Sequence, residues 1–312
     1  MKSLIIGGSG FIGTYLIEKL IENGDDVVNF DLVDSRIQGL NTIKGDIRDR
    51  IDLGKINFDI DCIYILAAIH RDDVQDMNKY YETNFDGLNN IIDFCNSMDI
   101  SKIIYYSSAA VYGDSFIDAQ EIDKLSPDSH YGKSKVKAEG SLRDWVKQKN
   151  KRKLLIIRPS VVYGLGSDSN MNRLIDYVIN NKFFIVGKGV NIKSISYVKN
   201  LVDFTCYMKS KLDSQITVYN YSDLPQMTIR EICDKISYIT KSRKVINVPY
   251  AFGYMFALFL DFISFITNKK LPISLDRINK SRAYTSLNTN KIENLNYKPR
   301  FDFSNAISET IR

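Results

Sequence analysis

The 312-residue sequence has few cysteines, no internal repeat and no long apolar run. The four cysteines show no C-x-x-C or other metal-ligand spacing, and no signal peptide is recognisable at the start, which indicates free thiols in a reducing cytoplasm and no metal site. No window reaches the roughly 20 uninterrupted apolar residues of a transmembrane helix. The nearest is Tyr250–Ile266, in which Asp261 is the single charged residue.

The basic excess of the chain is mild and is not gathered into an arm. The 42 Lys+Arg against 37 Asp+Glu leave a net charge of +5 that is spread along the sequence, which argues against nucleic acid as a partner. With 44% apolar and 25% charged residues, the composition is typical of a globular protein with a substantial core. No low-complexity tract or Pro/Gly-rich linker divides the chain into tethered modules.

The first half alternates short apolar runs with helical patterns. Five nearly continuous apolar runs predict buried strands at 4–6, 27–30, 62–66, 102–106 and 154–157. Apolar residues at helical spacing predict helices at 11–20, 84–98 and 131–148. Strands that alternate with helices, each strand apolar on both faces, predict an α/β fold with a Rossmann-type doubly wound parallel sheet.

The alternation breaks down after Pro159. A helix is expected at 171–180, strands at 183–186 and 218–221, and a helix after Thr228, where Glu231 completes a capping-box pattern. We expect residues 1–165 to form the Rossmann domain, with 191–221 packing back onto it. Residues 166–190 and 222–312 are expected to form a smaller α/β substrate-binding lobe.

A glycine-rich turn follows the first predicted strand. Gly7, Gly10 and Gly13 allow a tight turn and close backbone approach, so that the helix opening at Phe11–Ile12 can meet a pyrophosphate. Asp31, at the end of the second predicted strand, can accept hydrogen bonds from the adenosine ribose and would repel a 2′-phosphate. The glycine turn and Asp31 together favour NAD as the cofactor.

A tyrosine and a lysine four residues apart lie on one face of the third predicted helix. The ammonium of Lys135 can lower the pKa of the Tyr131 phenol and can also hold the cofactor ribose, which makes the phenol a usable base. Ser107 and Ser108 follow a predicted strand, at the sheet edge where α/β proteins bind ligands. Their hydroxyls are candidates for contact with the cofactor and the reacting oxygen.

Together these patterns resemble the extended short-chain dehydrogenase/reductase family, in its NAD-dependent sugar epimerase/dehydratase branch, over essentially the whole chain. The resemblance implies that Tyr131 is the catalytic base and acid, Lys135 its activator and Ser108 the catalytic hydroxyl. It also implies further cofactor contacts at Asp46, Ile47, Leu66, Ala67, Ala68, His70, Asn84, Ser107, Pro159 and Ser160, besides Gly7, Gly10, Phe11, Ile12, Gly13, Asp31, Tyr131 and Lys135.

The residues after the catalytic hydroxyl bear on the reaction. Dehydratases of this branch have an Asp-Glu pair there, whereas this chain has Ala109 and Ala110, so the resemblance implies hydride transfer without dehydration. A 4-epimerase fits best. A reductase of a 4-keto nucleotide sugar, which would use NAD(P), is the alternative in the same class, and a dinucleotide-sensing regulator is the alternative without catalysis.

The substrate is indicated by departures from the usual nucleotide-sugar pattern. Val161 replaces an Asn that commonly holds the diphosphate, and Lys193 replaces an Arg near the nucleotide. The string around His70 and Arg71 resembles bacterial enzymes that epimerise N-acetylglucosamine linked through diphosphate to undecaprenol, for surface polysaccharide (O-antigen) synthesis. A UDP-sugar substrate remains the alternative. Substrate contacts are expected at Arg71, Ser108, Val161 and Lys193.

The aromatic segment Tyr250–Ile266 has two interpretations. As a helix it would be apolar nearly all round, with Lys269–Lys270 just beyond its end. It would then be either a core helix or dimer contact of the substrate lobe, or a helix lying in the interface of the cytoplasmic membrane. The family resemblance further implies a homodimer.

Overall fold

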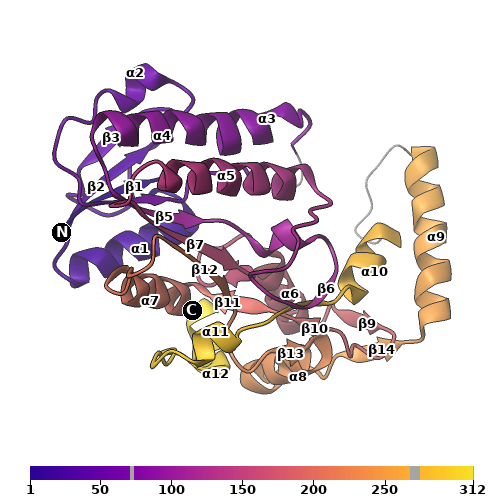
Figure 1. Ribbon diagram of the computed structural model, residues 1–312. Coiled ribbons are helices and arrows are strands. Elements are labelled where there is room, and N and C mark those ends of the chain that lie inside the picture. Colours follow the sequence, from indigo (N-terminus) through magenta and orange to yellow (C-terminus); the bar gives the residue numbers. More distant parts are fainter. Residues whose placement is uncertain (71–73, 268–274, 312) are drawn as a thin grey trace.

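The computed structural model describes residues 1–70, 74–267 and 275–311, and its largest element is a seven-stranded parallel sheet (Figure 1). The strands lie in the order β12-β7-β5-β4-β1-β2-β3, and every neighbouring pair is parallel. Their bounds are β1 Lys2–Ile6, β2 Asp26–Asp31, β3 Thr42–Lys44, β4 Cys62–Ile65, β5 Lys102–Tyr106, β7 Lys153–Pro159 and β12 Ile216–Tyr221. The predicted doubly wound α/β fold is confirmed.

The strand order reverses at β1, which pairs with β2 on one side and with β4 on the other. Connections leaving the carboxyl ends of β1 and β4 therefore run to opposite sides, and a crevice opens between them, which is where doubly wound sheets bind ligands. The glycine turn that follows β1 lies at this point.

Helices cover both faces of the sheet because successive strand residues point to opposite sides. Ile103 and Tyr105 of β5 pack with Leu88 of α4 and Leu142 of α5. The alternate residues of the same strand pack instead with α1 and α7, in a second cluster that includes Leu201. The helices of the two faces are α1 Phe11–Glu22 and α7 Val198–Lys209 on one side, and α4 Leu88–Ser97 and α5 His130–Lys147 on the other.

The predicted elements of the first half match the structure apart from their ends. The helix expected at 84–98 begins earlier, with α3 (Asn78–Tyr81), and continues through a π-helical turn η1 (Glu82–Gly87) before α4. The sequence pattern missed this start because Tyr80 is the single buried residue of α3. The short elements of this half are α2 Arg50–Leu53, η2 Ala109–Tyr112 and β6 Phe116–Ala119.

A smaller α/β part is built from later residues and from β6. One sheet has the order β13-β10-β15-β6, and two further parallel pairs are β8 with β11 and β9 with β14. The strands are β8 Val161–Tyr163, β9 Phe184–Val186, β10 Ile192–Lys193, β11 Ile195–Tyr197, β13 Met227–Thr228, β14 Ile246–Val248 and β15 Thr285–Leu287. The helices are α6 Asn170–Ile179, α8 Ile229–Thr240, α11 Asn290–Glu293 and α12 Phe303–Thr310.

One expectation for the second half is met by this arrangement. Thr228 and Glu231 form the predicted capping box at the start of α8. Of the stretch 191–221, β12 joins the large sheet and α7 covers it, whereas β10 and β11 belong to the smaller sheets. The division of the chain at residue 165 stays a prediction.

The aromatic segment forms one helix, α9 (Tyr250–Thr267), which stands apart from the body of the molecule (Figure 1). The short helix α10 (Leu275–Arg282) packs against it. Among the residues that the structure describes, no helix combines the length and the apolar character needed to cross a bilayer.

Candidate functional site

The turn after β1 requires glycine at two positions. Gly7 has a φ of +88°, and a Cβ there would lie 2.4 Å from the backbone nitrogen of Ala67. A Cβ on Gly13 would lie 2.6 Å from the carbonyl oxygen of Gly7, so the first turn of α1 packs directly on the loop. Ala67, which follows β4, thus lies against the glycine turn, and a side chain on Gly7 would separate the two segments.

The N-terminus of α1 begins directly at the glycine turn and carries backbone hydrogen-bond donors. Gly10 is its N-cap residue and supplies no side chain to cap it. The backbone N–H groups of Phe11 and Ile12 lie in the first turn, where a helix has no internal acceptors for them. Such a terminus binds an anionic phosphate through its N–H groups and its dipole, so these residues fit the pyrophosphate of a dinucleotide.

Asp31 lies beside the glycine turn at the end of β2. Its Oδ2 accepts a hydrogen bond from the backbone N–H of Ser9 at 2.9 Å, and its Oδ1 accepts one from Val33 at 3.3 Å. Asn29, two residues earlier, accepts a hydrogen bond from Gly8 N–H at 3.0 Å. The strand end therefore holds both the turn and the carboxylate that we expect to contact the ribose.

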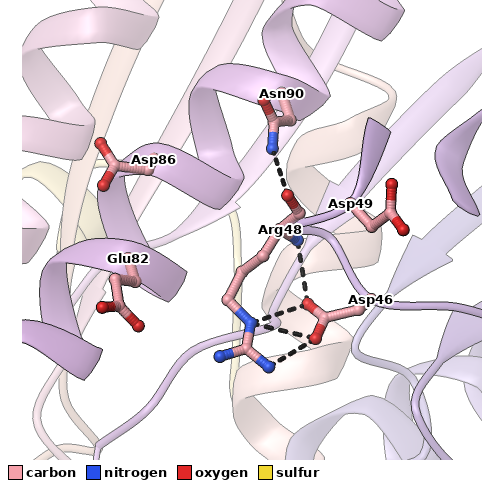
Figure 2. Close-up of a pocket in the computed structure, with 6 residues that line it drawn as sticks. All are labelled: Asp46, Arg48, Asp49, Glu82, Asp86 and Asn90. Carbon is pink, nitrogen blue, oxygen red and sulfur yellow. Dashed lines mark hydrogen bonds and ion pairs between the residues drawn. The ribbon is translucent and has the colours of Figure 1, made fainter. Parts of the chain in front are cut away.

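Asp46 lines a cavity of about 440 Å³ beside η1 and α4 (Figure 2). The Arg48 guanidinium donates from Nε to both carboxylate oxygens at 3.0 Å, and these hydrogen bonds lower the pKa of Asp46. Asn90 fixes the same loop by donating to the carbonyl oxygen of Arg48 at 3.1 Å. The carboxylate therefore stays ionised and oriented as an acceptor. The other lining residues are Asp49, Glu82 and Asp86.

Two further residues expected at the cofactor use their side chains inside the protein. The side chain of Ile47 is buried in the core, so only its backbone can face a ligand. The Asn84 amide accepts from Ile69 N–H at 2.8 Å and donates to Ile69 O and Ser134 Oγ, both at 2.9 Å. Asn84 therefore holds the segment after β4 against α5.

Tyr131 and Lys135 lie one turn apart on α5, as the spacing predicts. The ammonium of Lys135 lies 6.0 Å from the centroid of the Tyr131 ring. The centroid of the Tyr80 ring lies 6.5 Å from that of the Tyr131 ring. Tyr131 is half-buried, whereas Lys135 is only 2% exposed. The phenol therefore lies beside a desolvated cation.

The buried ammonium of Lys135 contacts the strand beneath its helix. Its Nζ donates to the carbonyl oxygen of Tyr106 at 2.8 Å and lies over the ring of Tyr105, 4.7 Å from the centroid. Burial lowers the pKa of Lys135 to about 7, although the charge of Glu139 acts in the opposite direction. A cation in such surroundings interacts more strongly with a neighbouring phenolate than it would in water.

Ser108 begins η2, directly after β5. Its Oγ accepts a hydrogen bond from Ala110 N–H at 3.1 Å, which leaves its own proton for another acceptor. A Cβ on Gly132 would lie 2.5 Å from the carbonyl oxygen of Ala110, so η2 packs directly on the turn of α5 that carries Tyr131. The structure therefore brings the three expected catalytic residues to one sheet edge.

A buried ion pair beneath this edge was not predicted. Arg158 donates to Glu139 from Nε at 2.9 Å and from Nη2 at 2.7 Å, and both side chains are almost fully buried. Burial opposes the charge of Arg158, but its hydrogen bonds to Glu139 keep the pKa of Arg158 above its usual range. Ser107 Oγ donates to the same carboxylate at 2.7 Å, so its hydroxyl is used there. The sequence feature that could have indicated this ion pair is an arginine at the end of a buried apolar strand.

The expected substrate residues are more dispersed. Val161 begins β8 and is 43% exposed, while Ser160, beside Pro159, shares a buried 2.7 Å hydrogen bond with Ser196. Lys193 Nζ donates to the carbonyl oxygen of Lys280 in α10 at 3.1 Å, and burial lowers the pKa of Lys193 to about 8. His70 is exposed. Arg71 lies outside the described residues.

Known proteins with similar sequences include NAD-dependent sugar epimerases. Residues 3–221 match the model of the NAD dependent epimerase/dehydratase family. The chain is 33% identical over 311 residues to an N-acetyl-alpha-D-glucosaminyl-diphospho-ditrans,octacis-undecaprenol 4-epimerase of Escherichia coli O157:H7, covering 99% of this chain and 94% of that protein. It is 27% identical to a UDP-glucose 4-epimerase of Lactobacillus helveticus, covering 81% and 84%.

Solved structures show the same fold. The UDP-glucose 4-epimerase of Thermus thermophilus in complex with NAD superposes with a TM-score of 0.77 at 20% identity, over 100% of this chain and 98% of that one. The UDP-Glc/GlcNAc 4-epimerase of Campylobacter jejuni gives a TM-score of 0.78 at 18% identity, over 99% and 97%. The glycine turn, the α1 terminus and Asp31 fit the cofactor that the family uses. The chain thus belongs to the NAD dependent epimerase/dehydratase family.

Proposed function

We propose that the protein is an NAD-dependent 4-epimerase of an N-acetylhexosamine linked through diphosphate to a polyprenol, converting GlcNAc-diphospho-undecaprenol to its GalNAc epimer. The observation that carries this proposal is the 33% identity, along 99% of the chain, to a relative named for that substrate. The UDP-glucose 4-epimerase of L. helveticus matches less of the chain, at 27% identity. Such a lipid-linked sugar would serve the synthesis of a surface polysaccharide.

Three residues carry the proton chemistry in this proposal. Tyr131 removes the proton of the C4 hydroxyl, and the buried Lys135 ammonium favours the phenolate by its charge. Ser108 donates a hydrogen bond to the reacting oxygen with the proton that its contact to Ala110 leaves available. NAD, when bound, would supply the group that accepts and donates the hydride.

The proposed cofactor contacts come from the residues around the carboxyl end of β1. We propose that the glycine turn and the first N–H groups of α1 bind the pyrophosphate, that Asp31 binds the adenosine ribose, and that Asp46 with the backbone of Ile47 contacts the adenine. Leu66, Ala67, Ala68, Pro159 and Ser160 line the same edge in this proposal, with His70 nearby. Asn84 and Ser107 position the edge from within, since their polar groups bond to protein.

The residues of η2 support epimerisation over dehydration. Elimination of water needs an acid and a base besides the tyrosine. The two positions after Ser108 are Ala109, which is buried, and Ala110, whose carbonyl packs on α5. Neither can transfer a proton.

We further propose that the chain functions as a homodimer in the cytoplasm, peripherally attached to the inner face of the membrane through Tyr250–Ile266. A lipid-linked substrate supports the location, because its undecaprenyl chain stays in the bilayer while the sugar is accessible to a protein. Val161, Lys193 and Arg71 are proposed to contact the substrate, with the ammonium of Lys193 and the guanidinium of Arg71 neutralising its diphosphate.

The test compares two substrates under identical conditions. The purified protein with NAD is incubated with GlcNAc-diphospho-undecaprenol in detergent micelles and, separately, with UDP-GlcNAc. The released sugars are separated by anion-exchange chromatography. We expect GalNAc from the lipid-linked substrate, with at least a tenfold lower rate from UDP-GlcNAc. Turnover of the UDP-sugar alone would overturn the lipid assignment, and net consumption of NADH with a 4-keto sugar would identify a reductase.

A further inference from the structure

The most exposed apolar side chains of α9 lie in one stripe. Phe252, Met255, Phe259 and Ile266 are 66, 63, 57 and 64% exposed, and their spacings of three, four and seven residues place them in one line along the helix. We call these four residues the α9 stripe. Large apolar side chains are seldom left in such a continuous line on a helix surrounded by water.

The opposite side of α9 attaches the helix to the protein through small residues. A Cβ on Gly253 would lie 2.7 Å from Val186 of β9, and Ala257 is fully buried in a cluster with Ile278 of α10. Asp261 Oδ2 accepts a hydrogen bond from the N–H of Leu275 at 3.0 Å, which fixes the start of α10. The orientation of the helix is therefore set by its packed side, and the α9 stripe points away from the body.

The charge of the sequence leading into α9, together with Arg282, favours an anionic lipid surface over a second copy of the chain. Residues 241–260 contain three cations, Lys241, Arg243 and Lys244, all exposed, and no acidic residue. A fourth cation, Arg282, stacks on the Tyr250 ring at 4.2 Å from its centroid. Two copies meeting through α9 would bring these like charges together, whereas anionic headgroups would neutralise them.

We propose that the α9 stripe docks the protein on the surface of an anionic phospholipid bilayer, with its apolar side chains among the acyl chains and the neighbouring cations at the headgroups. The helix is a monotopic attachment in this proposal, since its packed side remains on β9 and α10.

The docking surface is connected to a candidate substrate residue by one short helix. Ile278 of α10 packs on α9, and the carbonyl of Lys280 in the same helix accepts the hydrogen bond of Lys193. Docking would therefore fix the orientation of Lys193 relative to the membrane, to which a lipid-linked sugar is anchored. This last step rests on the proposed function, and the docking itself deepens the membrane attachment proposed there.

The test measures vesicle binding without any sugar substrate. The full-length protein is sedimented with vesicles of phosphatidylethanolamine and phosphatidylglycerol, and with vesicles of phosphatidylcholine alone. The variant carries Phe252→Ser, Met255→Ser and Phe259→Ser, and the control carries Tyr238→Ser on α8, where Tyr238 is 87% exposed. We expect the triple variant to bind the anionic vesicles at least tenfold more weakly than the parent and control. Equal binding by both variants would overturn the proposal.

A second measurement does not depend on the triple variant. The chain has one tryptophan, Trp145, which is buried, so a Phe259→Trp substitution adds a reporter on the α9 stripe. We expect its emission to shift to shorter wavelength with anionic vesicles, and a Tyr238→Trp control to show no shift. If Phe259→Trp is unshifted and sedimentation velocity shows that the triple substitution dissociates a dimer, the stripe binds a second copy, and lipid docking is wrong.

Discussion

The ammonium of Lys135 lies 4.7 Å from the centroid of the Tyr105 ring, on the strand beneath its helix. The Tyr105 hydroxyl is buried and has no hydrogen-bond partner among the residues that the structure describes, so the aromatic ring is the part of this side chain that contacts the lysine. A ring face attracts a cation, most strongly where both are desolvated. Tyr105 thus stabilises the charged form of Lys135 against the effect of burial.

This relationship predicts that Tyr105→Leu weakens the charged state of Lys135, whereas Tyr105→Phe does not. With a cation–π contribution of about 1 kcal/mol, the alkaline limb of the kcat profile should move roughly 0.5–1 pH unit lower in Tyr105→Leu. Tyr105→Phe retains the ring and should match the parent profile. Equal profiles for all three proteins would show that the ring has no effect on the lysine.

Replacing Tyr131 by Phe should remove the proton-transfer group and keep the ring packing against Tyr80. We expect kcat to fall by at least about 10³-fold, in the range lost with a general base. NAD affinity, measured by fluorescence quenching, should stay within about threefold of the parent, because the pyrophosphate site lies at α1. A Tyr131→Phe variant with near-normal turnover would refute the assigned role.

Alanine substitutions at Gly7 and Gly24 distinguish the cost of backbone strain from the cost of a steric clash. Both have positive φ, +88° and +82°, but only a Cβ on Gly7 would meet other atoms, at 2.4 Å from Ala67. We expect Gly24→Ala to cost about 1 kcal/mol of unfolding free energy in urea titrations. Gly7→Ala should cost more than about 3 kcal/mol or weaken NAD binding at least tenfold. Equal effects at the two positions would contradict the packing described for the turn.

The buried Lys135 should make stability depend on pH. Its pKa is about 7 in the folded chain and 10.5 when exposed, so the unfolded chain binds more protons between these values and stability rises with pH there. Lys135→Met removes this dependence. The variant should exceed the parent in unfolding free energy by roughly 2–4 kcal/mol at pH 6, and by much less at pH 10. Urea titrations without NAD at both pH values measure the difference, and a gain that is constant with pH would show that Lys135 is not desolvated.

Much of the first half could be predicted because its signals are local. Continuous apolar runs separated by helical patterns are sufficient for a covered parallel sheet, and a glycine turn between strand and helix marks the crevice. The spacing of Tyr131 and Lys135 places them on one helical face in any fold that keeps the helix. Short strands such as β10 and β13 were missed, because two residues carry no periodicity.

Contacts between distant segments were decided by the tertiary structure alone. The ring of Tyr105 meets Lys135, and Glu139 meets Arg158, because β5, α5 and β7 pack together. The sequence around each of these residues carries no pattern that predicts its partner. Likewise, the composition of Tyr250–Ile266 established an apolar helix, but its exposure follows from packing by Gly253 and Ala257 on one side only. Periodicity reports which residues share a face of one element, and only the assembled molecule determines what that face meets.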